Sequence, residues 1–549
     1  MARDGQDYPG DIFDYVIVGA GSAGCVLANR LSADPAIRVC LLEAGPKDRS
    51  PYIHIPLGFI GLIQHPELNW RFMAAPQSEI NGRQIYVPRG RVLGGTSSLN
   101  GMVYIRGHPT DYDDWAAAGN TGWSFADVLP YFKRSENNAN WRSSPFHGTD
   151  GPLAVTDHGR TSKMGRLLIE AAQSLQFPVN SDFNQGDKQE GFGFRQVTQR
   201  NGLRQSAAAA FLAPVRTRPN LKIITGCSVD RIRFRDGRAV GVDAHMRGET
   251  TAVRAAREVI VSAGAIASPL ILLRSGIGDG DALRRHGIGV QRHLPGVGHN
   301  LQDHTCIGID VCAPKAPSYG ISLRAIPALI ASAFEYALTR RGMFASNIVE
   351  AGGFVRTDPS LHRPNLSYTF MSARRNVLGG RMGRGHGYAL IPQLLRPRSR
   401  GQVALGGPGF DAPPWIDMGL LKDADDLEVL LQGLKLGRRI LDTPAFRNYG
   451  GFEELPGREV MSDDQLRRYI RQFCATAFHT VGTCRMGTDE MAVVDPTLRV
   501  RGIDGLRVVD GSVMPNIVGG NTNAPIIMIA EKASDMILGR PGPAPQLDR

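Results

Sequence analysis

The chain has 549 residues, of which 63 are Lys or Arg and 52 are Asp or Glu, so its formal net charge is +11. The basic residues are dispersed and no recognised nucleic-acid motif accompanies them, which argues against a nucleic-acid partner. No run approaches 18 apolar residues, and no basic segment precedes an apolar run near residue 1, so we expect neither a spanning helix nor a secretory signal. The seven cysteines contain no CxxC pair, which favours reduced thiols in a cytoplasmic protein without a metal site.

The first predicted elements are a strand, a tight turn and a helix within residues 15–31. The run YVIVGAGSAG is apolar up to Gly19, and helical spacing of apolar residues follows it. Gly19 permits the turn, Gly21 lets backbone N–H groups approach a pyrophosphate, and Gly24 lets the helix pack on the strand. The anion would meet the positive end of the helix dipole, beside Ser22 and Ala23.

A second strand is predicted at Val39–Leu42, and it ends at Glu43. An acidic residue about 20 residues beyond the glycines holds a ribose hydroxyl in dinucleotide-binding folds. A bound dinucleotide is predicted by this order of elements, which is strand, glycines, helix, strand and acidic residue. A lone GxGxxG would be weak support for such a ligand.

The segment RGRVLGGTSSLNGMVYIRG at 89–107 concentrates glycines, hydroxyls and an amide. Gly94 and Gly95 allow the main chain to approach a flat ligand, and the polar side chains after them can hydrogen-bond to it. Alone, this segment could be a turn-rich loop. After a dinucleotide motif, a second Gly-rich contact is typical of flavoproteins and favours a flavin over a nicotinamide.

Three long motifs carry a resemblance to a known family. They are RVLGGTSSLN at 91–100, GAIASPLILLRSGIG at 264–278 and VVDGSVMPNIVGGNTNAPIIMIAEKASDMI at 508–537. The chain resembles the glucose–methanol–choline (GMC) oxidoreductases and is most similar to bacterial choline-dehydrogenase-like, FAD-dependent alcohol dehydrogenases. With the nucleotide strand, the resemblance runs from about residue 13 to 537.

The resemblance implies an α/β (α+β) fold with two interwoven domains. Residues 1–155, 218–312 and 465–549 would form a Rossmann-like FAD-binding domain with a parallel sheet. Residues 156–217 and 313–464 would form a substrate domain with an antiparallel sheet flanked by helices. The remaining predicted elements, in chain order, are strands at 221–224 and 259–262, an amphipathic or buried helix at 325–338, strands at 367–371 and 388–395, and a helix at 427–440.

The resemblance also implies a set of FAD contacts. In the second Gly-rich segment these are Val92, Gly95, Thr96, Asn100, Gly101, Met102 and Val103. Trp70 and Val229 would lie on the adenine side, although a Trp is usually a core residue. Asp510 and Gly511 would meet the ribityl and pyrophosphate region, although Asp510 could equally cap a helix. Members that attach the flavin covalently have a His before this Asn, whereas this chain has Leu99, so we expect non-covalent FAD.

Alcohol oxidation needs a base, because an alcohol is roughly as weak an acid as water, with a pKa of ~15.7. Neutral His suits this role because its unperturbed pKa is about 6.5. His479, in the segment CATAFHTVGTCRMG, matches the family's catalytic base, and Asn523 matches its companion residue and a flavin contact. Without the flanking match, His479 would be interpreted as a core histidine and Asn523 as a turn residue.

The expected reaction is oxidation of a primary alcohol to an aldehyde, with hydride transfer to flavin N5 and electrons passed to a quinone-type acceptor. The alternatives are an oxygen-reducing oxidase of the same fold and a non-redox FAD lyase or photodecarboxylase. Phe478 suggests an apolar wall for aliphatic or benzylic alcohols. Glu350 is the candidate partner for a cationic alcohol such as choline, or else a buried, hydrogen-bonded Glu.

The densest basic cluster lies between Arg374 and Arg400. It is either a solvated loop face or a site of loose attachment to an anionic membrane, where a lipid quinone could collect electrons. Its members are Arg374, Arg375, Arg381, Arg384, Arg396, Arg398 and Arg400.

Overall fold

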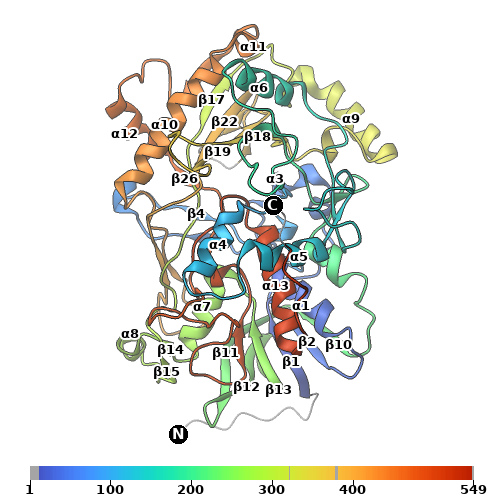
Figure 1. The fold of residues 1–549 in the computed structure, drawn as a ribbon, viewed down its shortest axis with the longest axis vertical. Coiled ribbons are helices and arrows are strands. Elements are labelled where there is room, and N and C mark those ends of the chain that lie inside the picture. Colours follow the sequence, from blue (N-terminus) through green and yellow to red (C-terminus); the bar gives the residue numbers. More distant parts are fainter. Residues whose placement is uncertain (1–11, 321, 377–380, 547–549) are drawn as a thin grey trace.

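Two sheets organise the molecule, one in the lower half and one in the upper half of Figure 1. The structure is a computed structural model that describes residues 12–320, 322–376 and 381–546. Within these residues, none of the helices combines the length and apolar character that crossing a membrane requires.

The first sheet has seven strands in the order β10-β2-β1-β13-β12-β11, with β27 also paired to β13. The second half of the long strand β13 pairs in parallel with β1 and β27, while its first half forms an antiparallel ladder with β12. The predicted strands at 39–42, 221–224 and 259–262 all lie in this sheet. The bounds are β1 Ile12–Val18, β2 Val39–Glu43, β10 Leu221–Thr225, β11 Cys227–Arg235, β12 Arg238–Met246, β13 Glu249–Val261 and β27 Leu506–Val508.

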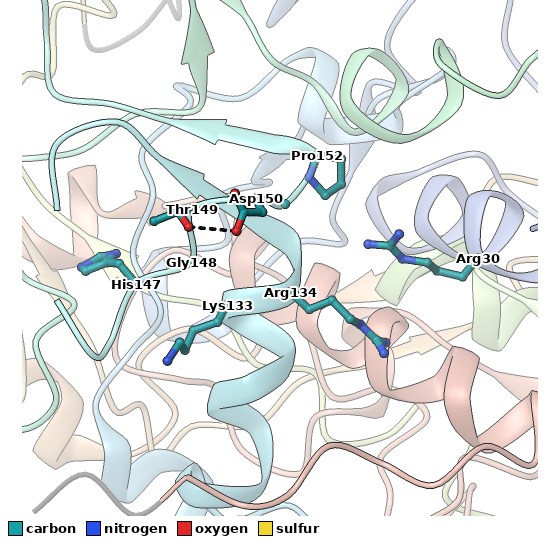
Figure 2. A pocket seen from close by; sticks show the side chains of 9 residues that line it. Arg30, Lys133, Arg134, His147, Gly148, Thr149, Asp150 and Pro152 are labelled. Carbon is teal, nitrogen blue, oxygen red and sulfur yellow. Dashed lines mark hydrogen bonds between the residues drawn. The ribbon is translucent and has the colours of Figure 1, made fainter. Parts of the chain in front are cut away.

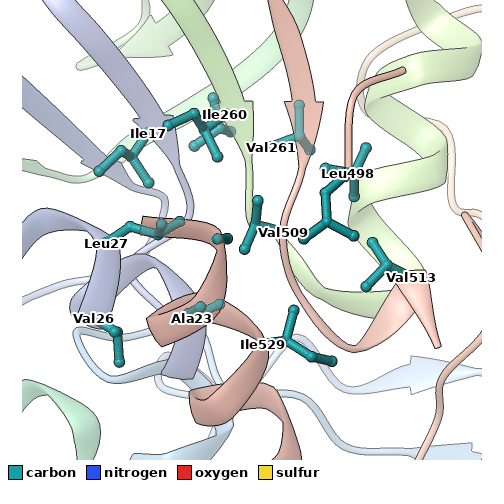
Figure 3. Packing of buried hydrophobic residues seen from close by; sticks show 14 of the residues in the cluster. Ile17, Ala23, Val26, Leu27, Ile260, Val261, Leu498, Val509, Val513 and Ile529 are labelled. Carbon is teal, nitrogen blue, oxygen red and sulfur yellow. The ribbon is translucent and has the colours of Figure 1, made fainter. Parts of the chain in front are cut away.

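Helices α1 (Ser22–Leu31) and α13 (Asn523–Leu538) pack against each other beside this sheet, although about 500 residues separate them in the sequence. Figure 3 shows Val26 and Leu27 of α1 and Ile529 of α13 close to Ile17 and Ile260 of the central strands. Most residues of both helices are buried, which is typical of helices that pack between layers. Other helices of this half are α4 Pro109–Ala117, α5 Phe125–Ser135, α7 Gly264–Arg274 and α8 Gly280–Arg285.

The second sheet has eight strands and is antiparallel, with the main order β25-β17-β22-β19-β18-β7. The predicted strands at 367–371 and 388–395 are β19 and β22. The bounds are β7 Gly191–Phe194, β16 Thr305–Cys306, β17 Ile309–Cys312, β18 Ala351–Val355, β19 Leu366–Met371, β22 Gly387–Leu394, β25 Phe452–Leu455 and β26 Ala475–Thr476.

Helix α10 (Ala424–Leu441) covers the second sheet and contains the helix predicted at 427–440. The Tyr368 hydroxyl of β19 donates to the Gly433 carbonyl of α10 at 2.7 Å, which fixes the close approach of helix and sheet. The other helices of this half are α6 Lys163–Ser174, α9 Ile326–Thr339, α11 Pro444–Arg447 and α12 Asp463–Phe473.

Three short strands near the predicted domain boundaries pair in the second sheet. Strands β16 and β17 belong to the second sheet, although the prediction placed residues up to 312 with the first domain. Strand β26 pairs with β16, so residues 475–476 also join the second sheet. The chain therefore crosses between the two halves within these segments, and segment β26 leads directly to His479.

Short elements complete the fold. They are the helices α2 Pro51–His54 and α3 Phe59–Leu62, and the paired strands β3 Phe72–Met73 with β4 Tyr86–Val87, β5 Glu136–Asn138 with β6 Leu153–Val155, β8 Gln199–Arg200 with β9 Leu203–Arg204, β14 Ile277–Gly278 with β15 Arg292–His293, β20 Arg375–Asn376 with β21 Arg381–Met382, and β23 Gln402–Ala404 with β24 Trp415–Asp417.

Candidate active site

The turn between β1 and α1 is as tight as its glycines predict. Gly19 has φ +99°, and a Cβ on Gly24 would lie 1.9 Å from the Gly19 carbonyl oxygen. Only a residue without a side chain allows the helix to start this close to the strand end. The first N–H groups of α1 have no partner within the helix, so the turn presents donors and a positive dipole end to an anion.

Glu43 lies buried at the end of β2, next to this turn. Its carboxylate accepts hydrogen bonds from the backbone N–H groups of Ala20 at 2.9 Å and Gly45 at 2.8 Å. Burial raises the pKa of Glu43 to about 7, and the two backbone donors oppose this shift. The carboxylate is thus fixed beside the turn, where a ribose hydroxyl could bind it.

The second Gly-rich segment meets the first turn directly. Gly95 begins the 3-10 turn Gly95–Ser98 with φ +53°, and a Cβ on it would lie 2.7 Å from the Cα of Gly21. Buried Arg204 holds this segment, because its guanidinium donates to Asn100 Oδ1 at 2.9 Å and to the Ser97 carbonyl at 3.2 Å. Two glycine turns far apart in sequence therefore form one cradle of bare backbone.

The remaining residues of this loop have defined partners. Met102, at φ +61°, donates its N–H to Asn100 Oδ1 at 3.0 Å, and the Gly101 carbonyl accepts from Asn347 at 2.6 Å. Thr96 Oγ1 accepts from the Gly90 N–H at 3.1 Å. Val92 is buried, and Val103 forms a bridge with Val197.

Asp510 lies buried directly after β27. Its carboxylate accepts from the Gly264 N–H at 2.7 Å, from the Ser268 hydroxyl at 2.5 Å and from the Ser512 N–H at 2.8 Å. Asp510 caps the short 3-10 turn that begins at Gly511. This agrees with the alternative prediction that Asp510 caps a helix. Asp510 joins this turn to the start of α7.

The two residues predicted on the adenine side differ in exposure. Trp70 is exposed, with the guanidinium carbon of Arg91 5.0 Å from its ring centre, so it is not a core residue. Val229 is a buried residue of β11.

His479 lies between a second histidine and an asparagine. Its Nδ1 is 2.9 Å from Nδ1 of buried His304, and its Nε2 is 3.0 Å from the Asn521 side-chain nitrogen. Because the amide nitrogen of Asn521 donates to Nε2, the ring proton resides on Nδ1 and points to His304. His479 is therefore oriented with the Nε2 lone pair toward Asn521.

Asn523 is not the residue that contacts His479, which corrects the sequence-based pairing. The Ser22 hydroxyl donates to Asn523 Oδ1 at 2.7 Å, so Asn523 lies at the start of α1. The reason is the local geometry, because α13 begins at Asn523 with Thr522 as its N-cap, whereas Asn521 precedes the helix. The predicted cofactor contact of Asn523 stays compatible with this position, whereas the companion of His479 is Asn521.

The surroundings of His479 hold it neutral. Burial, together with His304, Arg89 and Arg195, lowers the pKa of His479 well below its usual value of 6.5. Burial also lowers the pKa of His304, to about 4. Both rings are therefore neutral at pH 7, and a neutral imidazole is the form that accepts a proton.

Asp303 and Arg89 fix the backbone around His479. Buried Asp303 accepts from the His479 N–H at 2.8 Å and from the Thr476 hydroxyl. Arg89 donates to the Phe478 carbonyl at 2.7 Å and to the Thr480 hydroxyl. Phe478 adopts φ +67° and exposes its ring, so the segment turns sharply with the ring free to contact a ligand.

Glu350 is a buried, fully hydrogen-bonded carboxylate. It accepts from the Ser162 N–H at 2.6 Å, the Tyr319 hydroxyl at 3.0 Å and the Ser346 hydroxyl at 2.5 Å. These bonds agree with the structural alternative for Glu350 and argue against a role in binding a cationic substrate.

Family models and relatives identify this arrangement. The model of the N-terminal GMC oxidoreductase domain matches residues 13–306, and that of the C-terminal domain matches residues 397–530. The chain belongs to the GMC oxidoreductase family. Over 532 residues it is 45% identical to an alcohol dehydrogenase (acceptor) of Pseudomonas putida, with 96% of each chain covered. It is 41% identical to an oxygen-dependent choline dehydrogenase of Rhizobium johnstonii, again with 96% of each chain covered.

Solved structures agree with this family assignment. This GMC oxidoreductase is similar to pyridoxine 4-oxidase from Mesorbium loti, with a TM-score of 0.84, 32% identity, and coverage of 95% of this chain and 98% of that one. It is also similar to a formate oxidase, with a TM-score of 0.88, 26% identity, and coverage of 96% and 98%. The enzyme is therefore an FAD-dependent alcohol oxidoreductase with the expected two-sheet fold.

The residues present in this GMC oxidoreductase fit FAD. At Gly21 and Gly95 the two turns meet through backbone alone, which brings bare N–H groups of both to one place, and the α1 terminus suits a pyrophosphate. Glu43 would accept from a ribose hydroxyl, and Asp510 orders the turn on the opposite side. Leu99, before Asn100, is buried and has no nucleophilic atom.

The sequence interpretation missed three residues of this site, His304, Asn521 and Arg204. His304 ends the run NLQDH at 300–304, in which Gln302, Asp303 and His304 are all buried. Three consecutive polar residues just before the apolar strand at 309–312 are a signal that could have been noticed. Nothing in the sequence alone distinguishes Asn521 from Asn523, since both lie in GGNTNAP.

The basic cluster of this GMC oxidoreductase does not form a continuous cationic face. Four of its members are ion-paired, since Arg374 pairs with Glu454, Arg375 with Asp310, Arg396 with Asp111 and Arg398 with Asp425. Arg400 donates to the side chain of Asn300, and the side chain of Arg381 lies outside the described part. These contacts occupy five members of the cluster, whereas Arg384 is exposed, so membrane attachment through this cluster stays a prediction.

A hollow of about 510 Å³ lies at the other end of α1 (Figure 2). Arg30 and Arg134 line it, and both are paired with the buried carboxylate of Glu531, at 2.7 and 2.8 Å. These ion pairs tie α1 and α5 to α13. The hollow is separate from the α1 N-terminus, where the glycine cradle lies.

Proposed function

We propose that this enzyme oxidises uncharged primary alcohols to aldehydes, with His479 as the base and a quinone-type compound as the electron acceptor. The observation that carries the proposal is the position of neutral His479 between His304 and Asn521, beside the glycine cradle that fits FAD.

The chain's own residues would move the hydroxyl proton. Nε2 of His479 accepts it, since the proton on Nδ1 is oriented toward His304. The Asn521 amide, which donates to Nε2 without a ligand, would donate to the alcohol oxygen as negative charge develops there. FAD, when bound, supplies the chemistry that accepts the hydride from the adjacent carbon.

An uncharged substrate agrees with the groups that surround His479. The carboxylate of Glu350 already accepts three hydrogen bonds, while Arg89 and Arg195 lie close enough to depress the pKa of His479. The two arginines disfavour a quaternary ammonium, and the nearby Asp303 carboxylate already accepts from the His479 N–H and the Thr476 hydroxyl. The exposed ring of Phe478 favours an aliphatic or benzylic chain.

The acceptor is proposed from the relatives. The Pseudomonas putida relative is named an acceptor-type alcohol dehydrogenase, which favours a quinone-type acceptor. The rhizobial relative is named oxygen-dependent, and the solved structures include oxidases, so dioxygen is the second candidate.

The test is an anaerobic absorbance titration of the holoenzyme with hexanol, benzyl alcohol and choline. Bleaching by the first two and not by choline is the expected result. Fast recovery of the flavin colour with a soluble quinone and slow recovery in air would support a quinone-type acceptor. The reverse order would identify an oxidase. If no alcohol bleaches the flavin, the proposal fails.

His479→Ala provides the residue-level test. Loss of a general base costs about 10²–10⁴-fold in rate, so flavin reduction by alcohol should fall by at least about 10²-fold while the visible spectrum of bound FAD is retained. Full activity of this variant would reject His479 as the base.

A further inference from the structure

Helix α9 exposes an apolar strip to solvent. The sequence predicts an amphipathic or buried helix here, yet several large apolar side chains of the helix are exposed. Leu323 is 86% exposed, Phe334 67% and Leu338 84%. Leu323 lies in the 3-10 turn Leu323–Ala325 just before α9, and the other residues lie in α9 itself. We call this set the α9 strip, and its members are Leu323, Ile326, Ile330, Phe334 and Leu338.

The α9 strip is unusual because the helix is anchored on its opposite side. Tyr336 is buried, and its hydroxyl donates to the Gly202 carbonyl at 3.0 Å. Figure 1 shows α9 at the right-hand edge of the upper half, away from the sheets. Single exposed apolar side chains are ordinary, but a contiguous strip of large ones marks an interaction surface.

Cationic groups lie at the C-terminal end of the α9 strip. A cavity of about 410 Å³ there is lined by residues that include Arg160, Arg340 and Arg341, together with Asp157. The side chain of Arg160 is 3.5 Å from Glu335 and remains largely exposed. An apolar helix face with arginines at its end matches the chemistry of an anionic lipid headgroup layer above acyl chains.

We propose that the α9 strip and these arginines form a docking surface for an anionic lipid bilayer. The helix of 14 residues is roughly 21 Å long, so it would lie in the plane of the membrane interface with Phe334 and Leu338 among the acyl chains. A second copy of the chain could also bury the apolar face. Burial of that face alone would not use the arginines that line the cavity.

The docking surface lies close in the chain to the flavin loop. After α9 comes the 3-10 turn Met343–Ala345, and Asn347 then donates to the carbonyl of Gly101 at 2.6 Å. This inference rests on the proposed function in one respect. A lipid-soluble quinone acceptor is dissolved in the membrane, so an enzyme that reduces it must reach the membrane surface.

The experiment is co-sedimentation of the holoenzyme with vesicles of phosphatidylcholine alone and of phosphatidylcholine with 30–50% phosphatidylglycerol, ~0.1 M salt being present. Wild type should bind the anionic vesicles. The exposed double variant Phe334→Ser/Leu338→Ser should bind at least about tenfold more weakly, because each large apolar side chain contributes roughly tenfold to partitioning. Met461→Ser, at another exposed apolar site (72%), is the matched control and should bind like wild type.

The double variant Arg160→Gln/Arg341→Gln measures how much the arginines contribute to binding of the anionic headgroups. Each arginine near an anionic surface is worth about fivefold, so this variant should lose binding to anionic vesicles and change little on neutral ones. Equal loss on both kinds of vesicle would overturn the role of the arginines.

Three results would overturn the docking surface. In the first, wild type does not bind the vesicles, and in the second, wild type and the Phe334→Ser/Leu338→Ser variant bind them equally. The third result is that wild type binds no vesicles but is a dimer, which the same variant converts to a monomer. Anaerobic flavin reduction by hexanol is measured on the same samples. If reduction fails while vesicle binding follows the expected order, the proposed function fails and the docking surface stands.

Discussion

Two asparagines that are two residues apart have different partners, and this difference can be tested. Asn521 contacts His479, whereas Asn523 accepts from Ser22 at the start of α1. Removal of a donor to a developing oxyanion costs about 10²–10³-fold. We therefore expect Asn521→Ala to lower kcat/KM for hexanol by about that factor while FAD stays bound.

Asn523→Ala is the matched control for Asn521→Ala. It removes a contact at the cofactor side, so we expect weaker FAD binding, measured by fluorescence titration of the apoenzyme, with a near-normal rate once FAD is saturating. If the two variants exchanged these effects, the sequence-based companion Asn523 would be restored to the catalytic role.

The pH dependence of kcat/KM reports the protonation of the base. Because the pKa of His479 is well below 6.5, His479 stays neutral on acidification through pH 6.5, and activity should be constant from about pH 8 to 7. Burial raises the pKa of Asp303 to about 6, so a decline centred near pH 6 belongs to Asp303 and should disappear in Asp303→Asn. A decline centred above pH 6.5 in wild type would contradict a depressed pKa of His479.

At the scale of elements, the close packing of α1 on β1 depends on Gly24. A Cβ there would lie 1.9 Å from a backbone oxygen that no rotamer change can move. Overpacking of this kind costs about 1–3 kcal/mol or more. We expect Gly24→Ala to lower the free energy of unfolding by at least about 2 kcal/mol and to reduce FAD retention during purification.

Gly289→Ala is the control for Gly24→Ala, because a Cβ at residue 289 would meet no atom within 4 Å. Denaturant unfolding of both variants, followed by Trp fluorescence, measures the difference. Equal stability of the two variants would show that the strand–turn–helix unit can shift to accommodate a methyl group.

The local sequence pattern was sufficient to predict the position of most of the expected helices and strands. Strands β2, β10, β19 and β22 and helix α10 lie where the apolar runs and the helical spacing of the sequence predict them. The pattern of α9 also predicts a helix correctly, but not its surroundings. An apolar helical sequence is the same whether it faces a core, a partner or solvent.

At the scale of the whole molecule, the residues that would hold FAD come from both ends of the chain. Glu43, Gly95 and the start of α13 all lie around the glycine cradle, so FAD binding should stabilise the folded protein. At a free FAD concentration 100 times the Kd, the gain is about 2.7 kcal/mol. We expect the Tm of the apoenzyme to rise steadily with added FAD in a thermal scan.

The same preparation tests the mode of FAD attachment. Leu99 offers no nucleophile, so acid denaturation should release all of the flavin into the supernatant, and a yellow protein pellet would contradict non-covalent binding. A Tm that is independent of FAD concentration would contradict the joining of distant segments by the cofactor.

The sequence by itself determined the strand–turn–helix unit and the cofactor class, and it predicted His479 as the base, because glycine spacing and long motifs are local properties of the chain. Only the tertiary structure decided that Asn521 and His304 flank His479, that β16, β17 and β26 join the second sheet, and that the arginines at 374, 375, 396 and 398 are paired. These pairings connect residues separated by up to about 285 positions. They depend on which surfaces pack together, and no periodicity in the sequence records that choice.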